Sequence, residues 1–394
     1  LLVSCTGRSE RTGRDVPMAV PVAELVETAQ AMGAGDVVVR HPLQPWSQAR
    51  YATGQAYDKR MAAAAAAWRR GRERAEVPEP RFAEALPGDA RVPDELTLEG
   101  LARFWRHPLS QLVRWRLGLS LWEDDDELDG ALPFELDGLQ NWTLTDTVLQ
   151  AGRQGADLTM DGPLAQRLLR GSLLPLGAPG RVALSAALDQ VQGFLAQVAP
   201  LLEGPRPFRD VDLDVGRRLS GRVDGLTAQG RVVLHAGRVH PRHQLAAWIR
   251  HLALHADGWT GRTYVMGARD SVSFGSLGRD EAHDALRSLV GEVGPALRAP
   301  TLFWADASHG AWVAHEAEEE PSQKGWAAYH GAKTYWRNRN DQEKLVDGWV
   351  LDDVMPFRPN AHLSARVPDA PPPLALAELV WGPALAVRRS ERAP

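Results

Sequence analysis

Residues 95–119 read ELTLEGLARFWRHPLSQLVRWRLGL, and this stretch decides the fold of the region around it. A threonine hydroxyl accepts a hydrogen bond from the first turn of a helix, so Thr97 is expected to be a helix cap. Apolar residues follow it at helical spacing: Leu98, Leu101, Phe104 and Trp105. Proline is favoured at the first position of a helix, so a second helix is expected to begin at Pro108. The stretch predicts a helical hairpin whose apolar stripe faces a core.

Arginines of the same stretch fall outside the apolar stripe: Arg103, Arg106, Arg114 and Arg116. A guanidinium group can hold a phosphate through two parallel hydrogen bonds, which makes these side chains candidate DNA contacts. The whole chain has 45 lysines and arginines against 50 acidic residues, a net charge of −5. Because no overall basic field draws such a chain onto DNA, any contact with nucleic acid must be local.

A second candidate DNA contact lies in residues 333–340, where aromatic and cationic side chains alternate. Its members are Lys333, Tyr335, Trp336, Arg337 and Arg339. Bases stacked on the aromatic rings, with arginines on phosphates, would suit a single strand or a fork. A loop that packs its aromatic rings and exposes its arginines to water is equally consistent with the same residues.

Length and composition indicate part of a large globular assembly. The chain has 394 residues and 44% hydrophobic residues, enough for one large domain and part of another. It begins with leucine inside an apolar run, which we interpret as a fragment of a longer polypeptide. No run of eighteen apolar residues occurs, so no membrane span is expected. Cys5 is the one cysteine, which excludes an intramolecular disulfide and any four-cysteine zinc or iron–sulfur site.

Four motifs together resemble one known family. They are L-x-x-F-W-R-H-P at residues 101–108, PFELDGL at 133–139, LLPLGAPG at 173–180 and KGWAAYHG at 324–331. In this order they resemble the C-terminal part of RecC, the gamma subunit of bacterial exodeoxyribonuclease V. Related AddB-type subunits carry a four-cysteine iron–sulfur cluster, so the single cysteine favours a resemblance to the RecC family over one to the AddB-type subunits.

The resemblance implies three segments. Residues 1–75 would be the end of a defective helicase-like domain, with helices near 20–32 and 57–74. Residues 76–96, rich in proline and mixed charge, would be a linker. Residues 97–394 would form a nuclease-like C-terminal domain that lacks its catalytic centre. The expected fold class is α/β (α+β), an inactive restriction-endonuclease-like domain similar to the RecB nuclease.

The loss of the catalytic centre can be followed in the sequence. Nucleases of this class place an aspartate at the end of one strand, and an acid and a lysine on the next, to bind divalent ions and activate water. Asp224 is the candidate first acid, and residues 231–235 should carry the second. Residues 225–256 contain no Asp, Glu or Lys. The Gln244 to Trp248 segment resembles the Gln-x-x-x-Tyr helix of RecB-type nucleases, so the scaffold is expected without the chemistry.

Two further interpretations concern metals. His251 and His255 are four residues apart, so a helix would place both on one face, but the neighbourhood offers no acidic third ligand. We therefore expect core or interface histidines and no metal site. A migrated acid among Asp210, Asp212 and Asp214 would make the chain a metal-dependent DNA nuclease, because alternate residues of a strand share a face. A scaffold that binds partner subunits and no DNA is the third alternative.

The family resemblance also implies partners and a role. The partners would be RecB-like and RecD-like subunits, together with double-stranded DNA ends and forked or single-stranded DNA. The role would be non-catalytic, splitting the duplex and guiding strands in double-strand-break repair, with the whole subunit contributing to Chi recognition. No G-x-x-x-x-G-K-[ST] loop occurs, so ATP and Mg²⁺ would be used by the partner subunits and not by this chain. The expected location is the cytoplasm.

Overall fold

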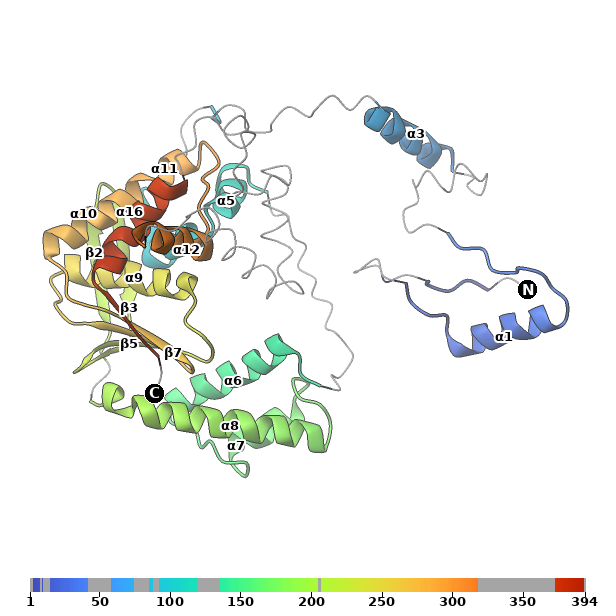
Figure 1. The fold of residues 1–394 in the computed structure, drawn as a ribbon, viewed down its shortest axis with the longest axis horizontal. Helices are drawn as coiled ribbons and strands as arrows, with labels where there is room; N and C mark the ends of the chain where they lie inside the picture. Colours follow the sequence, from blue (N-terminus) through green and yellow to red (C-terminus); the bar gives the residue numbers. More distant parts are fainter. Residues whose placement is uncertain are drawn as a thin grey trace. The chain divides into compact units, whose positions relative to one another are not determined.

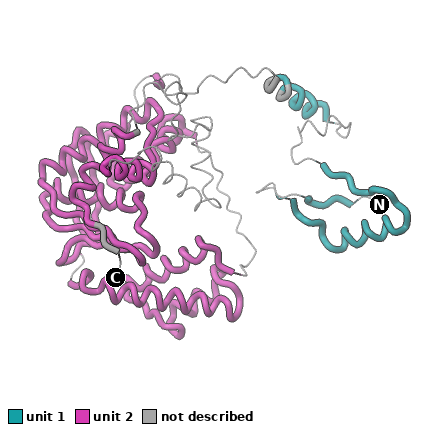
Figure 2. The backbone as a smooth tube through the Cα atoms, viewed as in Figure 1, with its two compact units in different colours: residues 1–79 teal, residues 80–394 magenta. Residues whose placement is uncertain are grey.

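The computed structural model describes residues 3–7, 9, 15–41, 58–73, 85–87, 92–119, 135–204, 207–317 and 373–392. The chain divides into two compact units, residues 1–79 and residues 80–394 (Figure 2). The first unit contains helices α1 (Val20–Ala31) and α3 (Lys59–Glu73), which confirms the two helices expected there. The segment boundaries implied by the family stay predictions, although Glu95 and Leu96 at the end of the expected linker already belong to a strand.

The second unit is a mixture of helices and strands, as the sequence predicts (Figure 1). Its strands are β1 (Glu95–Thr97), β2 (Arg209–Asp214), β3 (Arg218–Val223), β4 (Leu226–Thr227), β5 (Gly230–His235), β6 (Thr263–Gly267), β7 (Asp270–Phe274) and β8 (Arg388–Arg392). Its helices are α4 (Leu98–Arg106), α5 (Pro108–Gln111), α6 (Gly138–Arg153), α7 (Pro163–Arg170), α8 (Ala178–Val198), α9 (Pro241–Ala256), α10 (Arg279–Gly291), α11 (Val293–Ala296), α12 (Ala305–Glu316) and α16 (Pro373–Ala386). The described residues of this unit also include a π-helical turn (Leu112–Arg116) and a 3₁₀ turn (Ala199–Leu202).

The stretch that decides the fold is helical where expected. The Thr97 hydroxyl accepts a hydrogen bond from the Gly100 N–H at 2.9 Å, and α5 begins at Pro108. His107 caps α5, because its Nδ1 accepts a hydrogen bond from the Ser110 N–H at 3.1 Å. The apolar stripe is buried: Leu98, Leu101, Phe104 and Trp105 lie in the main core. The two predicted helix starts and the buried stripe are confirmed, but α5 has only four residues and continues as a π-helical turn that the spacing did not predict.

Replacing Thr97 with alanine is expected to lower the free energy of unfolding by about 1 kcal/mol, because one N–H of the first turn of α4 loses its acceptor. Chemical denaturation of the two proteins measures the difference. Thr97→Ser keeps the hydroxyl and is expected to restore most of the loss. Equal losses in the serine and alanine variants would show that the cap does not stabilise α4.

Strands β1, β2 and β3 form a small sheet in the order β1-β3-β2. Strand β1 runs parallel to β3, and β2 runs antiparallel to it. One face is apolar, and its side chains Val211, Leu219 and Val223 join the main core with α4 and α9. The other face is charged and exposed. This alternation with a period of two is what an antiparallel pair with one solvated face requires.

The second sheet has the order β4-β5-β6-β7-β8, with β5 and β6 parallel and the other neighbouring pairs antiparallel. Both of its faces are covered by helices (Figure 1). Val233 and Val265 pack into the core that contains α9, α10 and α16. Val232, Leu234 and Met266 point the other way and pack with α6, α7 and α8. The result is a three-layer arrangement with a core on each side of the sheet.

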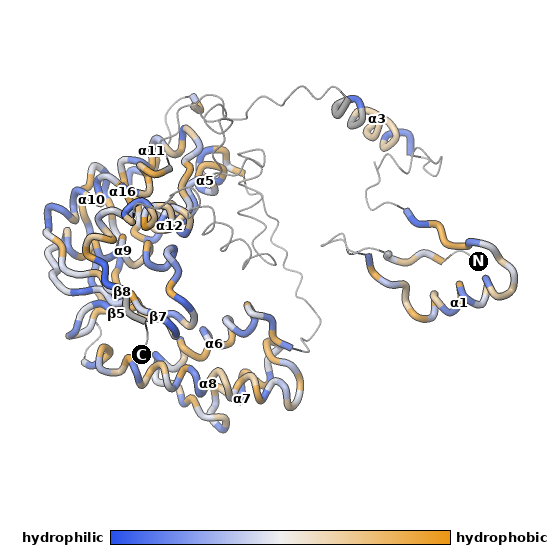
Figure 3. Tube along the Cα trace, viewed as in Figure 1, coloured by the Kyte–Doolittle hydropathy of each residue, from blue (hydrophilic) through white to orange (hydrophobic). Residues whose placement is uncertain are grey.

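Helix α8 shows how the outer layer is built. Its buried side chains include Leu184, Leu188 and Val191 at helical spacing, while polar residues lie between them. Figure 3 shows this alternation of apolar and polar segments along α8. Among the helices of the described residues, each is too short or too polar to cross a lipid bilayer.

Candidate functional site

The residues expected from the sequence to mark a lost nuclease centre lie on β5 and α9 and directly after β3. Asp224 follows β3, and its side chain is exposed. Strand β5 forms as predicted, but it carries Arg231 at its start and no carboxylate along Arg231–His235. A metal-dependent centre needs converging carboxylates, and this arrangement supplies one solvent-exposed acid.

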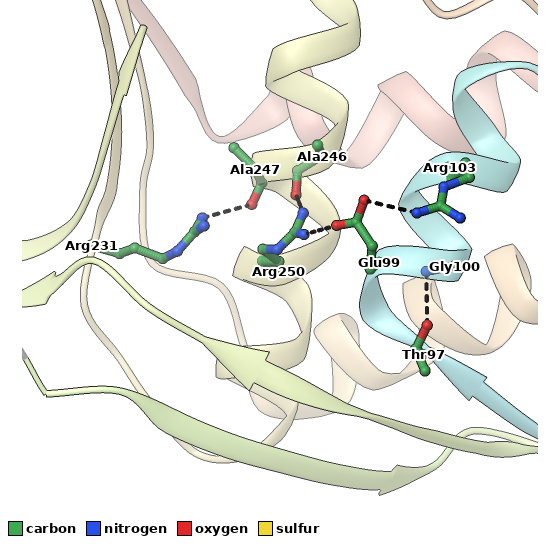
Figure 4. Close-up of polar contacts among 8 residues, drawn as sticks. All are labelled: Thr97, Glu99, Gly100, Arg103, Arg231, Ala246, Ala247 and Arg250. Atoms are coloured by element: carbon green, nitrogen blue, oxygen red, sulfur yellow. Dashed lines mark hydrogen bonds and ion pairs between the residues drawn. The ribbon is translucent and has the colours of Figure 1, made fainter. Parts of the chain in front are cut away.

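A buried guanidinium occupies this region. The Arg231 residue is 4% exposed. Its Nε donates to the backbone carbonyl of Asp224 at 3.1 Å, and its Nη1 donates to the carbonyl of Ala247 at 3.4 Å (Figure 4). Burial and, to a smaller extent, the neighbouring Arg250 lower the pKa of Arg231 to about 10, while Asp224 opposes the change. The group therefore keeps its positive charge at neutral pH, and a fixed cation here would repel a divalent metal ion.

A carboxylate from α4 compensates the positive charge beside Arg231. Glu99 Oε2 accepts a hydrogen bond from Arg250 Nη2 at 2.5 Å, and Glu99 Oε1 lies 3.7 Å from Arg103 Nη2. Arg250 also donates to the carbonyl of Ala246 on its own helix at 3.0 Å. Figure 4 shows Glu99 between Arg103 and Arg250, which joins α4 to α9. The first helix of the expected hairpin is therefore tied by charge to the helix that covers β5.

The helix that resembles the Gln-x-x-x-Tyr segment has become part of the core. The Gln244 side chain is buried; its Nε2 donates to the Val239 carbonyl at 3.2 Å, and its Oε1 accepts from Arg388 Nη1 at 3.2 Å. Trp248 is buried and packs against His251 and Phe274, with ring centroids 5.4 and 5.2 Å apart. Both side chains are buried and contribute to the packing of the core.

Two of the three acids proposed for a migrated centre, Asp210 and Asp212, are paired with arginines. Asp210 accepts hydrogen bonds from Arg222 at 2.8 and 3.2 Å, and Asp212 accepts from Arg218 at 3.0 and 2.8 Å. These hydrogen bonds hold the pKa of each carboxyl below its usual range. Asp214 accepts from the Gly216 N–H at 3.1 Å in the following turn. Alternate residues share a face as expected, but that face is a ladder of ion pairs.

His251 and His255 lie on one buried face of α9, as their spacing predicts, with ring centroids 4.3 Å apart. His251 Nδ1 is 3.0 Å from the Thr263 hydroxyl. The ring nitrogens of His255 lie 2.8 Å from the Leu277 carbonyl and 3.0 Å from the Gly261 carbonyl. These contacts place both rings in the core. Within the described part of the chain, no three His, Cys, Asp or Glu side chains converge in a geometry that could hold a metal.

The burial of His251 predicts a loss of stability in acid. Burial, together with the nearby His255 and Arg231, lowers the pKa of His251 to about 3, although a backbone hydrogen bond at Gly275 opposes the shift. The unfolded chain binds this proton near pH 6.5, so the unfolded state binds more protons between pH 6.5 and 3. Stability therefore falls as the pH falls through this window, by about 1.4 kcal/mol per pH unit from this group below pH 5.5.

Denaturation at pH 5.5 and 4.5 measures the slope, and His251→Phe is expected to reduce it by that amount. The matched control is His315→Phe, because His315 is exposed at the end of α12. If both variants keep the slope of the original protein, His251 is not a neutral core residue.

The candidate DNA-contacting arginines of residues 95–119 have different surroundings. Arg103, Arg106 and Arg114 are exposed, and Arg103 forms the ion pair with Glu99 described above. Arg116 is half-buried and donates to the Pro87 carbonyl. The second cluster, Lys333, Tyr335, Trp336, Arg337 and Arg339, lies outside the described residues. The role of both sets in DNA binding stays a prediction.

Sequence reasoning missed Arg231 and Arg250 as members of this region. The sequence contains a pattern that points to Arg231. The segment 225–256 has arginines but no acids, and Arg231 lies near the start of an otherwise apolar strand. An arginine at that position of a buried strand predicts a cation held by backbone carbonyls, since it cannot reach solvent. The partner of Arg250 is Glu99, which comes from a helix more than a hundred residues earlier, and no local pattern reveals that pair.

Comparison with known proteins shows the family of the chain. Residues 93–317, more than half of the chain, match the family model of the RecC C-terminal domain. The RecBCD enzyme subunit RecC of Mycolicibacterium smegmatis is 28% identical over 389 residues, which cover 93% of this chain and 35% of that protein. RecC of Mycobacterium tuberculosis is 30% identical over 263 residues, covering 63% and 23%. RecC of Escherichia coli is 23% identical over 271 residues, covering 68% and 24%.

The chain thus spans about a third or less of the length of these relatives. The resemblance read from the four motifs is confirmed by the family match over the region that contains α4, β5 and α9. This chain belongs to the family of the RecC C-terminal domain.

Proposed function

We propose that this chain is part of a non-catalytic, RecC-type subunit of a RecBCD helicase–nuclease that acts in double-strand-break repair by homologous recombination. The relatives it matches are named as RecC subunits of the RecBCD enzyme. The observation that carries the non-catalytic role is the buried guanidinium of Arg231, held by two backbone carbonyls beside Asp224. A cation in that position takes the place where a nuclease needs a divalent metal and its carboxylate ligands.

The proposed partners are RecB-like and RecD-like subunits, which would supply the ATP and Mg²⁺ chemistry. The proposed substrates are duplex ends and forked or single-stranded DNA in the cytoplasm. In this proposal the C-terminal domain contacts the partner subunits and helps to split the duplex and guide its strands, and the whole subunit contributes to Chi recognition. The nuclease-like scaffold would then supply rigid surfaces for these contacts in place of a catalytic centre.

A native gel of the full chain with labelled forked DNA, with and without Mn²⁺, tests the proposal. A shifted and uncut fork is expected. Cleavage that depends on Mn²⁺ would overturn the non-catalytic role. The double variant Asp210→Asn with Asp212→Asn would then show whether these ion-paired acids form the catalytic metal centre. Neither shift nor cleavage would overturn the DNA role of this region and favour a scaffold that binds partner subunits alone.

The salt dependence of DNA binding tests whether particular arginines contact phosphate groups. Alanine at Arg337 and Arg339 is expected to reduce the slope of log affinity against log salt by about 1.4 for a single strand, because two phosphate contacts are lost. The same test applies to Arg106 and Arg114, which are exposed on the other candidate segment. An unchanged slope would remove the pair in question from the interface.

A further inference from the structure

The carboxyl ends of the parallel strands β5 and β6 meet at one edge of the larger sheet. His235, the last residue of β5, is in register with Gly267, the last residue of β6. The two loops that follow are joined, because the Ala268 N–H donates to the Gly237 carbonyl at 3.1 Å. In open α/β sheets, ligands bind in the crevice outside the carboxyl ends of the strands. This edge is therefore the first place to look for a second binding surface.

An exposed tryptophan lies against this edge. Trp142 of α6 is 42% exposed, although its neighbours Leu144 and Val148 on the same helix are fully buried. Its indole packs on the backbone of Gly237, where a Cβ atom would lie 3.4 Å from Cδ1 and 3.6 Å from Nε1. One part of the ring is thus supported by the loop after β5, while the rest remains open to solvent. A large aromatic surface kept exposed on a rigid helix is suited to stacking.

Two exposed arginines lie on the loops that meet at this edge. Arg238 follows Gly237, and Arg269 follows Ala268, so the hydrogen bond between those two residues brings the arginine-bearing loops together. Within the described residues neither arginine forms an ion pair, whereas the exposed Arg218, Arg222 and Arg287 each do. The carboxylate of Asp270, on the same turn as Arg269, accepts the Val239 N–H at 2.8 Å. The two guanidinium groups are available to an anionic ligand.

We propose that Trp142, Arg238 and Arg269, here named the Trp142 patch, bind a single DNA strand. A base would stack on the open part of the indole, and the two guanidinium groups would contact phosphates on either side. The inference rests on the proposed function, because it assigns one strand of the divided duplex to a surface of this domain. Trp142 lies on α6, whose buried side chains belong to the core on the other side of the larger sheet from α4 and α9.

A nucleic-acid strand fits this chemistry better than an acidic peptide. Every base offers a flat π face to an indole, so stacking on Trp142 would tolerate any sequence. Guanidinium groups on phosphates supply charge without sequence preference, and the net charge of −5 means that attraction must come from such local groups. An acidic peptide would use the arginines and leave the exposed indole face without a matching partner.

The test is the affinity of the full chain for an oligothymidine of about 20 nucleotides, followed by fluorescence anisotropy over a range of salt. Trp142→Ala is expected to weaken binding about tenfold, and Trp142→Phe to retain most of the affinity, because phenylalanine still stacks. Arg238→Ala with Arg269→Ala is expected to reduce the salt slope by about 1.4. The control is Arg287→Ala, which removes one exposed arginine from α10 on the opposite layer and should leave the affinity unchanged.

Thermal unfolding of each variant shows whether its fold is retained. If the original chain binds the oligothymidine, and if Trp142→Ala and the double arginine variant bind it equally well, the Trp142 patch is overturned and the proposed DNA role stands. Failure of the original chain to bind any forked or single-stranded DNA would overturn both. A polyglutamate peptide is the competing ligand. If it binds as tightly as the oligothymidine, and if its binding depends on Arg238 and Arg269 but not on Trp142, the patch binds an acidic protein partner and the strand assignment is overturned.

Discussion

Replacing Trp105 with alanine is expected to lower the free energy of unfolding by about 3–5 kcal/mol, the range for removing a large aromatic side chain from a packed core. Trp105 is fully buried on α4. Its ring meets Phe104 and Phe303 edge to face, with centroids 5.6 and 5.2 Å apart, and its Nε1 donates to the Leu289 carbonyl at 3.1 Å. The substitution removes these contacts together, leaves a cavity and strands a buried carbonyl.

Urea denaturation of the Trp105→Ala variant measures the loss, and Trp142→Ala provides the matched control. Trp142 is the same residue type but is 42% exposed, so its replacement is expected to cost about 1 kcal/mol or less. Trp105→Phe should recover part of the loss, because a phenyl ring fills much of the cavity but cannot donate to Leu289. Similar losses for the two alanine variants would mean that α4 is not anchored in the main core by Trp105.

Replacing Gly225 with alanine is expected to lower the free energy of unfolding by about 2–5 kcal/mol, for two reasons that add. Gly225 has φ of +77°, a left-handed conformation that a side chain disfavours. A Cβ atom there would also lie 2.5 Å from the carbonyl oxygen of Val232. The clash is with backbone, and the Gly225 carbonyl accepts the Val232 N–H at 2.7 Å, so the strand cannot move aside without breaking this link.

The control for Gly225→Ala is Gly216→Ala. Gly216 has φ of +86°, but nothing lies within 4 Å of the position of its Cβ. Its replacement isolates the conformational cost, about 1 kcal/mol. The difference between the two variants in chemical denaturation measures the close approach of the β3–β4 turn to β5. If both glycines cost the same, that approach is looser than the structure shows.

Several elements of the fold follow from local sequence. The cap at Thr97, the start of α5 at Pro108 and the apolar stripe of α4 were all predicted, because capping and helical spacing act over a few residues. The strand expected at residues 231–235 is present as β5, and the helix expected from the resemblance of Gln244 to Trp248 is present as α9. The absence of acids from 225–256 could also be read directly, and with it the expected loss of a nuclease centre.

Other features could not be predicted, because they depend on residues far apart in the chain. The contact of Glu99 with Arg250 joins α4 to α9 across 151 positions, and the pairs of Asp210 with Arg222 and Asp212 with Arg218 depend on the register of β2 and β3. Trp142 and Arg238 were not singled out, because their meeting needs α6 to pack on the loop after β5. The sequence favoured the arginines of residues 95–119 for DNA, yet Arg116 donates to the Pro87 carbonyl.

The sequence by itself determined the mixed α/β class, the two helix starts in residues 95–119, membership of the RecC family and the lack of a second acid after Asp224. These depend on patterns that repeat every two or 3.6 residues, or on which residue types are present. The tertiary structure alone decided that a buried Arg231 lies beside Asp224, and that Trp142 packs on the backbone of Gly237, next in sequence to the exposed Arg238. Burial and charge compensation are properties of packed neighbours, and packing brings together residues that the chain keeps apart.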